Sequence, residues 1–333
     1  MSHKKLNVVV IGGGTGSSTV ITGLKHDPYL DLSCILAVTD SGGSTGRLRD
    51  EFGFAPVGDL RQALAALAAN HNEPWVHDVL LYRFSKGSGL EGHNLGNLLL
   101  LALQDLTKST PKAIKIASQI FGVTGNIYPI TNKNIQLVIE YEDGTIEIGE
   151  HNLDLPTHGG ETIVGLKTSP RAKILPQAQK AIRAADYLII GPGDVYGSIL
   201  PNLIVDGASQ VIKSSRAKII YVLNLMSRYS QTHNLTAQNH VDIIQSYLTR
   251  PVDFVITNTA AIPPKVLAAY RREHEHPIVS DLHPDAPFQV IRAPIIKTTR
   301  VKSQRGDHLR RSYLRHDPDK LARLLIQIME HTP

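Results

Sequence analysis

The feature that most limits the fold of this chain is a run of glycines directly after a short apolar segment near its start. Residues 6–11 read LNVVVI, and GGGTGSS follows at residues 12–18. A continuous β-branched run is typical of a strand that is buried on both faces of a parallel sheet. Glycines allow positive φ and let the backbone approach a phosphate, and a helix beginning there offers free N–H groups. The pattern predicts a phosphate-binding turn, although a turn used only for packing would need the same glycines. The candidate ligands are Gly13, Gly14, Thr15 and Gly16.

The rest of the chain alternates short apolar runs with helical patterns. Further strands are predicted at residues 35–39, 187–190, 218–223 and 254–257. Helices are predicted at residues 59–69, 95–106, 112–121, 176–185, 202–213, 236–248, 263–274 and 318–329. Asp317 stands at the N-cap position of the last helix. Strands alternating with helices favour an α/β, Rossmann-like fold, with a doubly wound, mostly parallel sheet and helices on both faces.

One segment, residues 134–150, has a different pattern. Apolar residues alternate with polar ones from residue 135 to residue 141, and Asp143-Gly144 is a typical hairpin turn. We expect an added antiparallel β-hairpin at one side of the main sheet. The chain shows no internal repeat, low-complexity linker or break in composition, so residues 1–333 are expected to form a single domain.

The composition excludes several classes of protein. The single cysteine, Cys34, rules out a disulfide framework, and the longest apolar stretch, residues 95–103, is far short of the ~20 residues of a membrane span. We do not expect the first residues to act as a signal peptide, because their apolar run breaks at glycines. A formal charge of +5 is too mild to indicate nucleic acid, and the basic run at residues 297–315 could face solvent or an anionic ligand. We expect a soluble, cytoplasmic protein that binds neither membrane nor nucleic acid.

Two more loops follow predicted strands. Residues 40–49, DSGGSTGRLR, combine small residues, hydroxyls and arginines, which suit a diphosphate. Asp40 stands where dinucleotide-binding folds hold a ribose hydroxyl, and Arg47 is a candidate diphosphate ligand. Residues 191–198, GPGDVYGS, form a second turn between a strand and a helix. The candidates in this turn and at the end of the next strand are Gly193, Ser198 and Asn224. Loops of this kind at strand ends predict a ligand lying across a crevice where the strand order switches.

Polar residues also begin two of the predicted helices. Asp59, in GDLR, is either an N-cap or a ligand. His93 and Asn97, in GHNLGN, either cap and pack this helix or face the same crevice. The sequence His274-Glu275-His276 could be a metal pair, but it ends a charged helix before a proline, which favours a solvated terminus.

The ordered set of motifs resembles a known family. GGGTG, TDSGGSTGRLR, GDLRQ, GHNLGN, GPGDVYGSILPNL and LRHDP occur in this order over residues 5–330. Together they resemble the gluconeogenesis-factor (YvcK) family, which shares its fold with the 2-phospho-L-lactate transferases (CofD) of deazaflavin coenzyme synthesis. Two departures stand out: Ser41 replaces a second acid, and residues 226–232 differ from the family's usual stretch.

The resemblance implies a cytoplasmic bacterial protein that binds a UDP-sugar of the UDP-GlcNAc type. It implies a regulator of cell shape and cell-wall metabolism during growth on gluconeogenic carbon, with cell-wall synthesis proteins or a second copy of the chain as expected partners. Tyr270 and Arg315 match positions linked in the family to nucleotide-sugar binding. A tyrosine ring can stack on a uracil or sugar face, and arginine can bind a pyrophosphate with two hydrogen bonds.

Whether the chain catalyses a reaction stays open at this point. The transferase branch implies transfer of a phosphorus-containing group from a nucleoside-diphosphate donor, with Mg²⁺ near Asp40 or Asp59. A third alternative, an NAD(P) oxidoreductase, fits the first glycine turn but gives the two other loops no task.

Overall fold

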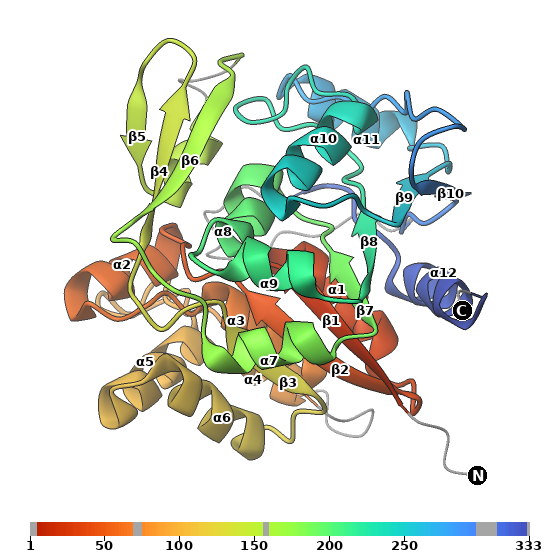
Figure 1. Cartoon of the computed structure of the whole chain (residues 1–333). Helices are drawn as coiled ribbons and strands as arrows, with labels where there is room; N and C mark the ends of the chain where they lie inside the picture. The colour runs from red at the N-terminus through yellow and green to blue at the C-terminus, as the bar shows by residue number, and fades with distance from the viewer. Residues whose placement is uncertain (1–4, 69–74, 156–159, 298–311, 332–333) are drawn as a thin grey trace.

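A seven-stranded parallel sheet, in the order β10-β9-β8-β7-β1-β2-β3, forms the centre of this computed structural model (Figure 1). The structure describes residues 5–68, 75–155, 160–297 and 312–331. The strands are β1 (Leu6–Gly12), β2 (Leu30–Leu36), β3 (Asn126–Pro129), β7 (Tyr187–Ile190), β8 (Lys218–Val222), β9 (Phe254–Asn258) and β10 (Gln289–Ala293). From β1 the order grows in one direction to β3 and in the other to β10, so the strand order switches between β1 and β7. The predicted α/β, doubly wound fold is confirmed.

The centre of the sheet explains why β1 reads as one continuous apolar run. Val10 pairs with Cys34 on β2 and with Ile189 on β7, and none of the three has exposed surface. Because β1 is flanked on both sides and covered on both faces, its residues from Val8 to Ile11 are all apolar, and the polar Asn7 lies near its start. The same register places the turns that follow β1 and β7 next to each other.

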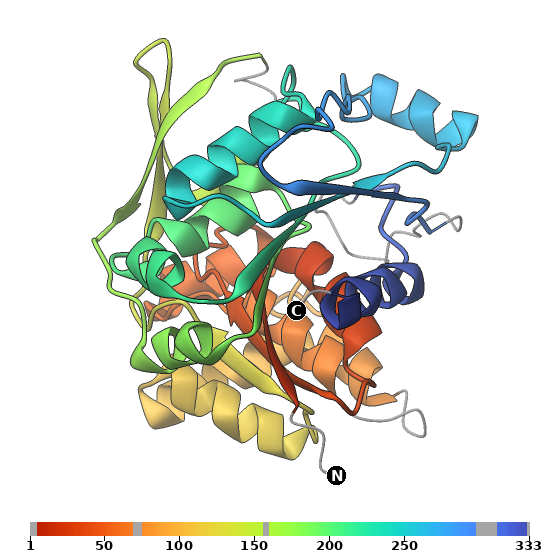
Figure 2. The same cartoon turned by 45° about the vertical axis from the view of Figure 1, so that its right-hand side comes forward.

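Helices cover both faces of the sheet (Figures 1 and 2). One layer contains α1, which packs against α3 and against α12, and the other contains α7, α9 and α10. The helices are α1 (Gly14–Leu24), α2 (Gly43–Phe52), α3 (Gly58–Leu67), α4 (Trp75–Leu81), α5 (Leu95–Thr107), α6 (Thr110–Ile120), α7 (Pro176–Ala184), α8 (Leu200–Leu203), α9 (Ala208–Ser214), α10 (Ala237–Leu248), α11 (Pro264–Arg271) and α12 (Pro318–His331).

The Asp317 carboxylate accepts the backbone N–H groups of Asp319 and Lys320, both at 3.1 Å, so it caps α12 as predicted.

The predicted hairpin exists but belongs to a sheet of its own. It consists of β4 (Gln136–Tyr141) and β5 (Ile146–Ile148), and β6 (Ile163–Ser169) pairs with β4 on the other side. All pairs are antiparallel, and the sheet stands apart from the main one (Figure 1, upper left). A short 3₁₀ turn, Glu150–Asp154, follows β5 and returns toward the main sheet.

Several boundaries differ from the predictions for physical reasons. The second strand lies at residues 30–36 rather than 35–39, because the earlier residues pair with β1. The predicted helix over residues 202–213 is broken at Gly207, whose φ of 90° is left-handed. Sequence analysis did not predict β3, β6, β10, α2 or α4.

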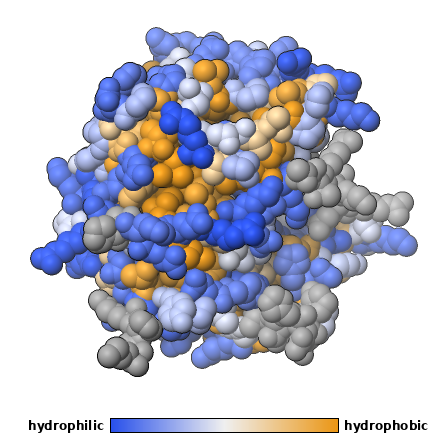
Figure 3. Space-filling view, turned by 90° about the vertical axis from the view of Figure 1, so that its right-hand side faces the viewer, coloured by the Kyte–Doolittle hydropathy of each residue, from blue (hydrophilic) through white to orange (hydrophobic). Residues whose placement is uncertain are grey.

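Apolar residues gather in the middle of the face beside α12 and β10, and polar residues surround them (Figure 3). The helix α12 buries Leu321, Leu325 and Ile328 and presents its polar side to solvent. Among the residues that the structure describes, no helix has the length and hydropathy to cross a membrane.

Candidate functional site

A cavity of about 480 Å³ opens at the carboxyl ends of the strands, beside the switch between β1 and β7. Its wall comes from the loops after β1, β2, β7 and β8, from the 3₁₀ turn after β5, and from residues 312–316. This is the position at which open α/β sheets bind ligands, and the volume suits a small molecule.

The first glycine turn brings the start of α1 to the cavity. Gly13 is the N-cap of α1, has extended backbone and supplies no side-chain cap of its own, and the Asp59 carboxylate lies close to it. Gly14 has a left-handed φ of 62°. A Cβ on Gly16 would overlap the carbonyl oxygen of Pro192, so the close approach of the two turns requires glycine. The four candidates of this turn, Gly13, Gly14, Thr15 and Gly16, all line the cavity.

Two more helices begin at the same cavity without a side-chain cap. Gly42 is the N-cap of α2 and Val57 that of α3. The glycine-rich segment after β2 is therefore a loop only as far as Gly42 and continues as α2. Asp40 accepts the Gly42 N–H at 3.0 Å, and Asp59 lies in the first turn of α3 rather than at its N-cap. Three helix N-termini thus converge on one space, which favours an anion.

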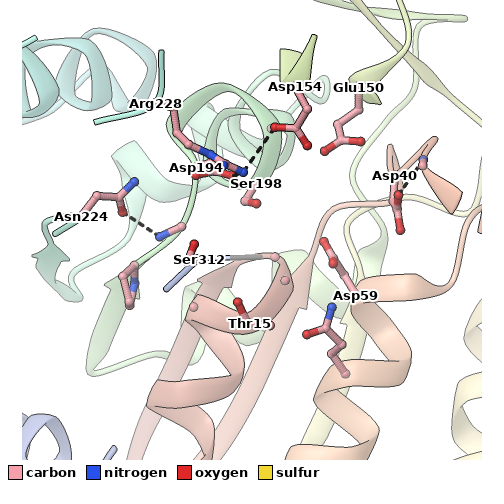
Figure 4. A pocket seen from close by; sticks show the side chains of 18 of the residues that line it. Thr15, Asp40, Asp59, Glu150, Asp154, Asp194, Ser198, Asn224, Arg228 and Ser312 are labelled. Atoms are coloured by element: carbon pink, nitrogen blue, oxygen red, sulfur yellow. Dashed lines mark hydrogen bonds and ion pairs between the residues drawn. The ribbon is translucent and has the colours of Figure 1, made fainter. Parts of the chain in front are cut away.

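The turn after β7 is tied to the first glycine turn. The buried Asn202 side chain donates to the carbonyl oxygens of Gly12 and Ser198, both at 2.9 Å. The Gly193 N–H donates to Asn224 Oδ1 at 3.0 Å, which joins this turn to the loop after β8. Gly193, Ser198 and Asn224 all line the cavity, as Figure 4 shows for the last two.

Arg47 and His93 do not line the cavity. Arg47 is exposed on α2 and donates to the Glu91 carbonyl oxygen at 3.3 Å. The His93 ring lies 3.2 Å from Ser44 Oγ, and burial, with the charge of Arg47, lowers the pKa of this histidine. Asn97 does line the cavity and donates to Thr45 Oγ1 at 3.2 Å.

The two candidates of the C-terminal half line the cavity in different ways. Tyr270 is only 3% exposed, and its phenol oxygen accepts the Leu314 N–H at 3.1 Å. Its ring lies edge-on to Tyr313 with the ring centroids 5.3 Å apart. Tyr270 therefore offers a ligand little free ring surface. Arg315 also lines the cavity. Most of the predicted basic run, residues 298–311, lies outside the described residues.

An ion-pair cluster around Arg228, on the same cavity, was not predicted. Arg228 reaches Asp154 and Asp194 at 3.3 Å each and Glu275 at 3.7 Å (Figure 4 shows the first two acids). Asp194, foremost among these acids, raises the pKa of Arg228. Glu275 is 1% exposed, so the expected solvated terminus at residues 274–276 is wrong for this residue.

Glu150, on the 3₁₀ turn, faces the same space. Burial raises the pKa of this carboxyl well above its usual value, and the nearby charges of Asp40, Asp154 and Asp59 raise it further. The Ser41 N–H is a distant donor, 3.5 Å from Glu150 Oε2. In Figure 4 the carboxylates lie along the upper and right sides of the cavity, above Thr15.

His316 lines the cavity from the C-terminal segment and is buried. Burial lowers the pKa of His316 to about 4, against a smaller opposite effect of its hydrogen bond to the Leu223 backbone. The ring is therefore neutral at pH 7.

The described part of the chain holds no group of three or more His, Cys, Asp or Glu side chains placed to bind a metal ion. Asp40 and Asp59 alone do not form a protein-only metal site, and Asp40 already accepts a backbone N–H. Mg²⁺ is commonly held by one or two carboxylates together with substrate phosphates, so this pair fits an ion only when a phosphate is bound.

Comparison with known proteins gives a consistent result. The family described as 2-phospho-L-lactate transferase CofD matches residues 8–298. The gluconeogenesis factor of Bacillus subtilis is 34% identical, over 98% of this chain and 99% of its own. That of Halalkalibacterium halodurans is 39% identical, over 84% of this chain and 86% of its own.

A solved structure has the same fold. The crystal structure of a member of the upf0052 family from Bacillus halodurans superposes with a TM-score of 0.87 at 35% identity. The match covers 97% of this chain and 99% of the other.

Proposed function

Because the chain belongs to the 2-phospho-L-lactate transferase CofD family, and its relatives carry the name gluconeogenesis factor, we propose that it is a UDP-sugar-binding regulator. The ligand is a nucleotide-sugar of the UDP-GlcNAc type. The regulated process is cell-wall metabolism and cell shape during growth on gluconeogenic carbon, in the cytoplasm, through contact with cell-wall synthesis proteins.

The observation that carries the proposal is the convergence of three helix N-termini, none with a side-chain cap, on one cavity at the strand switch. Uncapped N–H groups and helix dipoles stabilise phosphate oxygens in this position. The charge of Arg315 adds to this attraction from the C-terminal segment.

The cavity divides into parts that suit the parts of such a ligand. The start of α1 and Ser198 would hold the diphosphate. Leu225, Met226 and Leu314 form an apolar part of the wall next to Tyr270, which suits the uracil ring. Asp40 would accept a hydroxyl of the ribose or the sugar.

A second function, a Mg²⁺-dependent transferase of phosphorus-containing groups, is favoured by the family match itself. Asp40 and Asp59 would hold the metal together with the phosphates of a nucleoside-diphosphate donor, and the metal would neutralise phosphate charge. The protein itself would bind and orient the nucleoside-diphosphate donor through the N–H groups of α1 and α2.

A thermal-shift comparison of UDP-GlcNAc, UDP-glucose, GDP with Mg²⁺, and NADPH tests the proposal. At concentrations about 100-fold above Kd, a ligand stabilises the fold by roughly 2.7 kcal/mol, which raises the melting temperature measurably. We expect a shift with the two UDP-sugars. A shift with GDP and Mg²⁺ alone would replace the regulator by the transferase, and a shift with NADPH alone would contradict both.

Arg315→Ala supplies the matched test of the site. We expect it to weaken UDP-GlcNAc binding, because the guanidinium lies on the cavity wall. Arg171→Ala, which removes an exposed arginine outside the cavity, is the control and should bind normally. Normal binding by Arg315→Ala would remove that residue from the site.

A further inference from the structure

We propose that one side of the cavity selects the sugar of the ligand: it accepts an uncharged, hydroxyl-rich sugar and rejects one that carries a carboxylate. This inference rests on the proposed function. The surface responsible is called here the acid wall, and it consists of Asp40, Asp59, Glu150, Asp154 and Asp194.

The acid wall is assembled from four separate segments. Asp40 follows β2, Asp59 begins α3, Glu150 and Asp154 belong to the 3₁₀ turn after β5, and Asp194 follows β7. In Figure 4 these carboxylates point toward the space above Thr15. A Cβ on Gly197 would lie 3.3 Å from Glu150 Oε1, so this carboxyl is packed closely against the turn after β7.

Negative charge is already crowded on the acid wall. Burial, and then the charges of Asp40, Asp154 and Asp59, raise the pKa of Glu150. A further anion placed beside these groups would meet the same repulsion, which is strong where solvent screening is weak. A carboxylate of the ligand is therefore disfavoured there.

The acid wall is at the same time rich in hydrogen-bond acceptors. Carboxyl oxygens accept hydrogen bonds from hydroxyl groups, and the raised pKa of Glu150 favours its protonated form, which can also donate one. Asn97, which is 1% exposed and lines the same cavity, adds a side-chain oxygen, Oδ1, that has no hydrogen-bond partner among the residues that the structure describes. Both features suit a group that donates hydrogen bonds without bringing charge, which is the chemistry of a sugar hydroxyl.

The arginines near the acid wall must be weighed against it. Arg228 is surrounded by Asp154, Asp194 and Glu275, so its charge is already compensated. Arg83 donates to the Gly92 carbonyl oxygen at 2.7 Å, and Arg61, which is buried, also lines the cavity. If these two arginines governed the ligand's charge, an acidic sugar would bind more tightly than a neutral one, and the proposal would be wrong.

Calorimetric titration of the wild-type chain with UDP-glucose and with UDP-glucuronate measures the selection, because the two ligands differ by a carboxylate at one carbon. We expect UDP-glucuronate to bind at least about tenfold more weakly at pH 7.5. Equal or tighter binding of UDP-glucuronate overturns the inference and leaves the proposed function intact. Failure of UDP-glucose and UDP-GlcNAc to bind contradicts the proposed function itself.

A pair of variants locates the effect. Asp154→Asn removes one charge of the acid wall, and we expect the preference for UDP-glucose over UDP-glucuronate to shrink. Glu140→Gln removes a carboxylate that is 43% exposed on β4 and pairs with Lys167 outside the cavity, so the preference should not change. A preference that shrinks equally in both variants would show a general charge effect and contradict the assignment to the acid wall.

Discussion

The two sides of the cavity are built in opposite ways. The glycine side, at the start of α1 and the turn after β7, presents backbone N–H groups and is held by contacts that only glycine permits. The acid wall presents side-chain oxygens and is held by ion pairs to Arg228. The first side suits phosphate, whereas the second is charged and suits hydroxyls. The two sides meet where the Asp59 carboxylate lies against Gly13.

The largest effect is expected from removing the cation that holds the acid wall. Arg228→Ala leaves Glu275, which is 1% exposed, without this partner and separates the 3₁₀ turn from the loops after β7 and β8. Leaving a buried carboxylate without its cation costs at most about 4 kcal/mol of unfolding free energy, which urea denaturation measures. Most of the loss is expected from Glu275, because Asp154 and Asp194 are 43% and 34% exposed and solvent screens their pairs. Arg171→Ala breaks an exposed pair with Asp206 that solvent screens, so its unfolding free energy should stay close to that of the wild-type chain. Equal losses in both variants would show that the cluster does not hold the wall.

The next effect is a pH dependence on the C-terminal side of the cavity. Burial lowers the pKa of His316 to about 4, below the value of about 6.5 of an unfolded histidine. The unfolded chain therefore binds more protons, so stability falls as the pH falls from about 6.5 to about 4, by about 3 kcal/mol in total. His316→Gln should flatten this acid limb in urea denaturation series. The control His77→Gln, in an exposed side chain, should keep it. An unchanged acid limb in His316→Gln would count against the burial of a neutral ring.

On the glycine side a single methyl group is expected to matter. Gly16→Ala places a Cβ on the Pro192 carbonyl oxygen, which forces the two turns apart and costs about 2 kcal/mol. The same change should weaken UDP-sugar binding, because both turns contribute to the cavity. Gly89→Ala is the matched control, since nothing lies within 4 Å of its Cβ position. The comparison fails if the two variants unfold at the same urea concentration.

The smallest effect concerns Glu150 and has the opposite sign to that of His316. Its folded pKa is raised by burial and by Asp40, Asp154 and Asp59, so the folded chain binds more protons and loses stability as the pH rises above the unfolded value of about 4.3. Glu150→Gln removes this loss. The variant should gain stability relative to the wild-type chain between pH 5 and pH 8, measured by thermal unfolding. A constant difference over that range would contradict the raised pKa.

The same division separates what could be predicted from the sequence from what could not. The glycine side depends on neighbours in sequence. The turn at residues 12–18 and Ser198 carry their own local signals, and Ser198 and residues 13–16 of the turn line the cavity. The acid wall depends on topology. Arg228 pairs with Asp154 and Glu275, which are distant in the sequence, so no local sequence motif marks these residues as neighbours. Arg47 was predicted as a diphosphate ligand from its local sequence, and this prediction is wrong. The segment that carries it is the helix α2, which directs the Arg47 side chain to the Glu91 carbonyl oxygen, outside the cavity.

The most direct test is an electron-density map of crystals of the wild-type chain soaked with UDP-GlcNAc. We predict density for the diphosphate at the N-terminus of α1, within hydrogen-bond distance of the Gly14, Thr15 and Gly16 N–H groups, with the sugar directed toward Asp154. Density for the diphosphate against the acid wall, or a nucleotide bound outside this cavity, would contradict the division of the site into a phosphate side and a hydroxyl side.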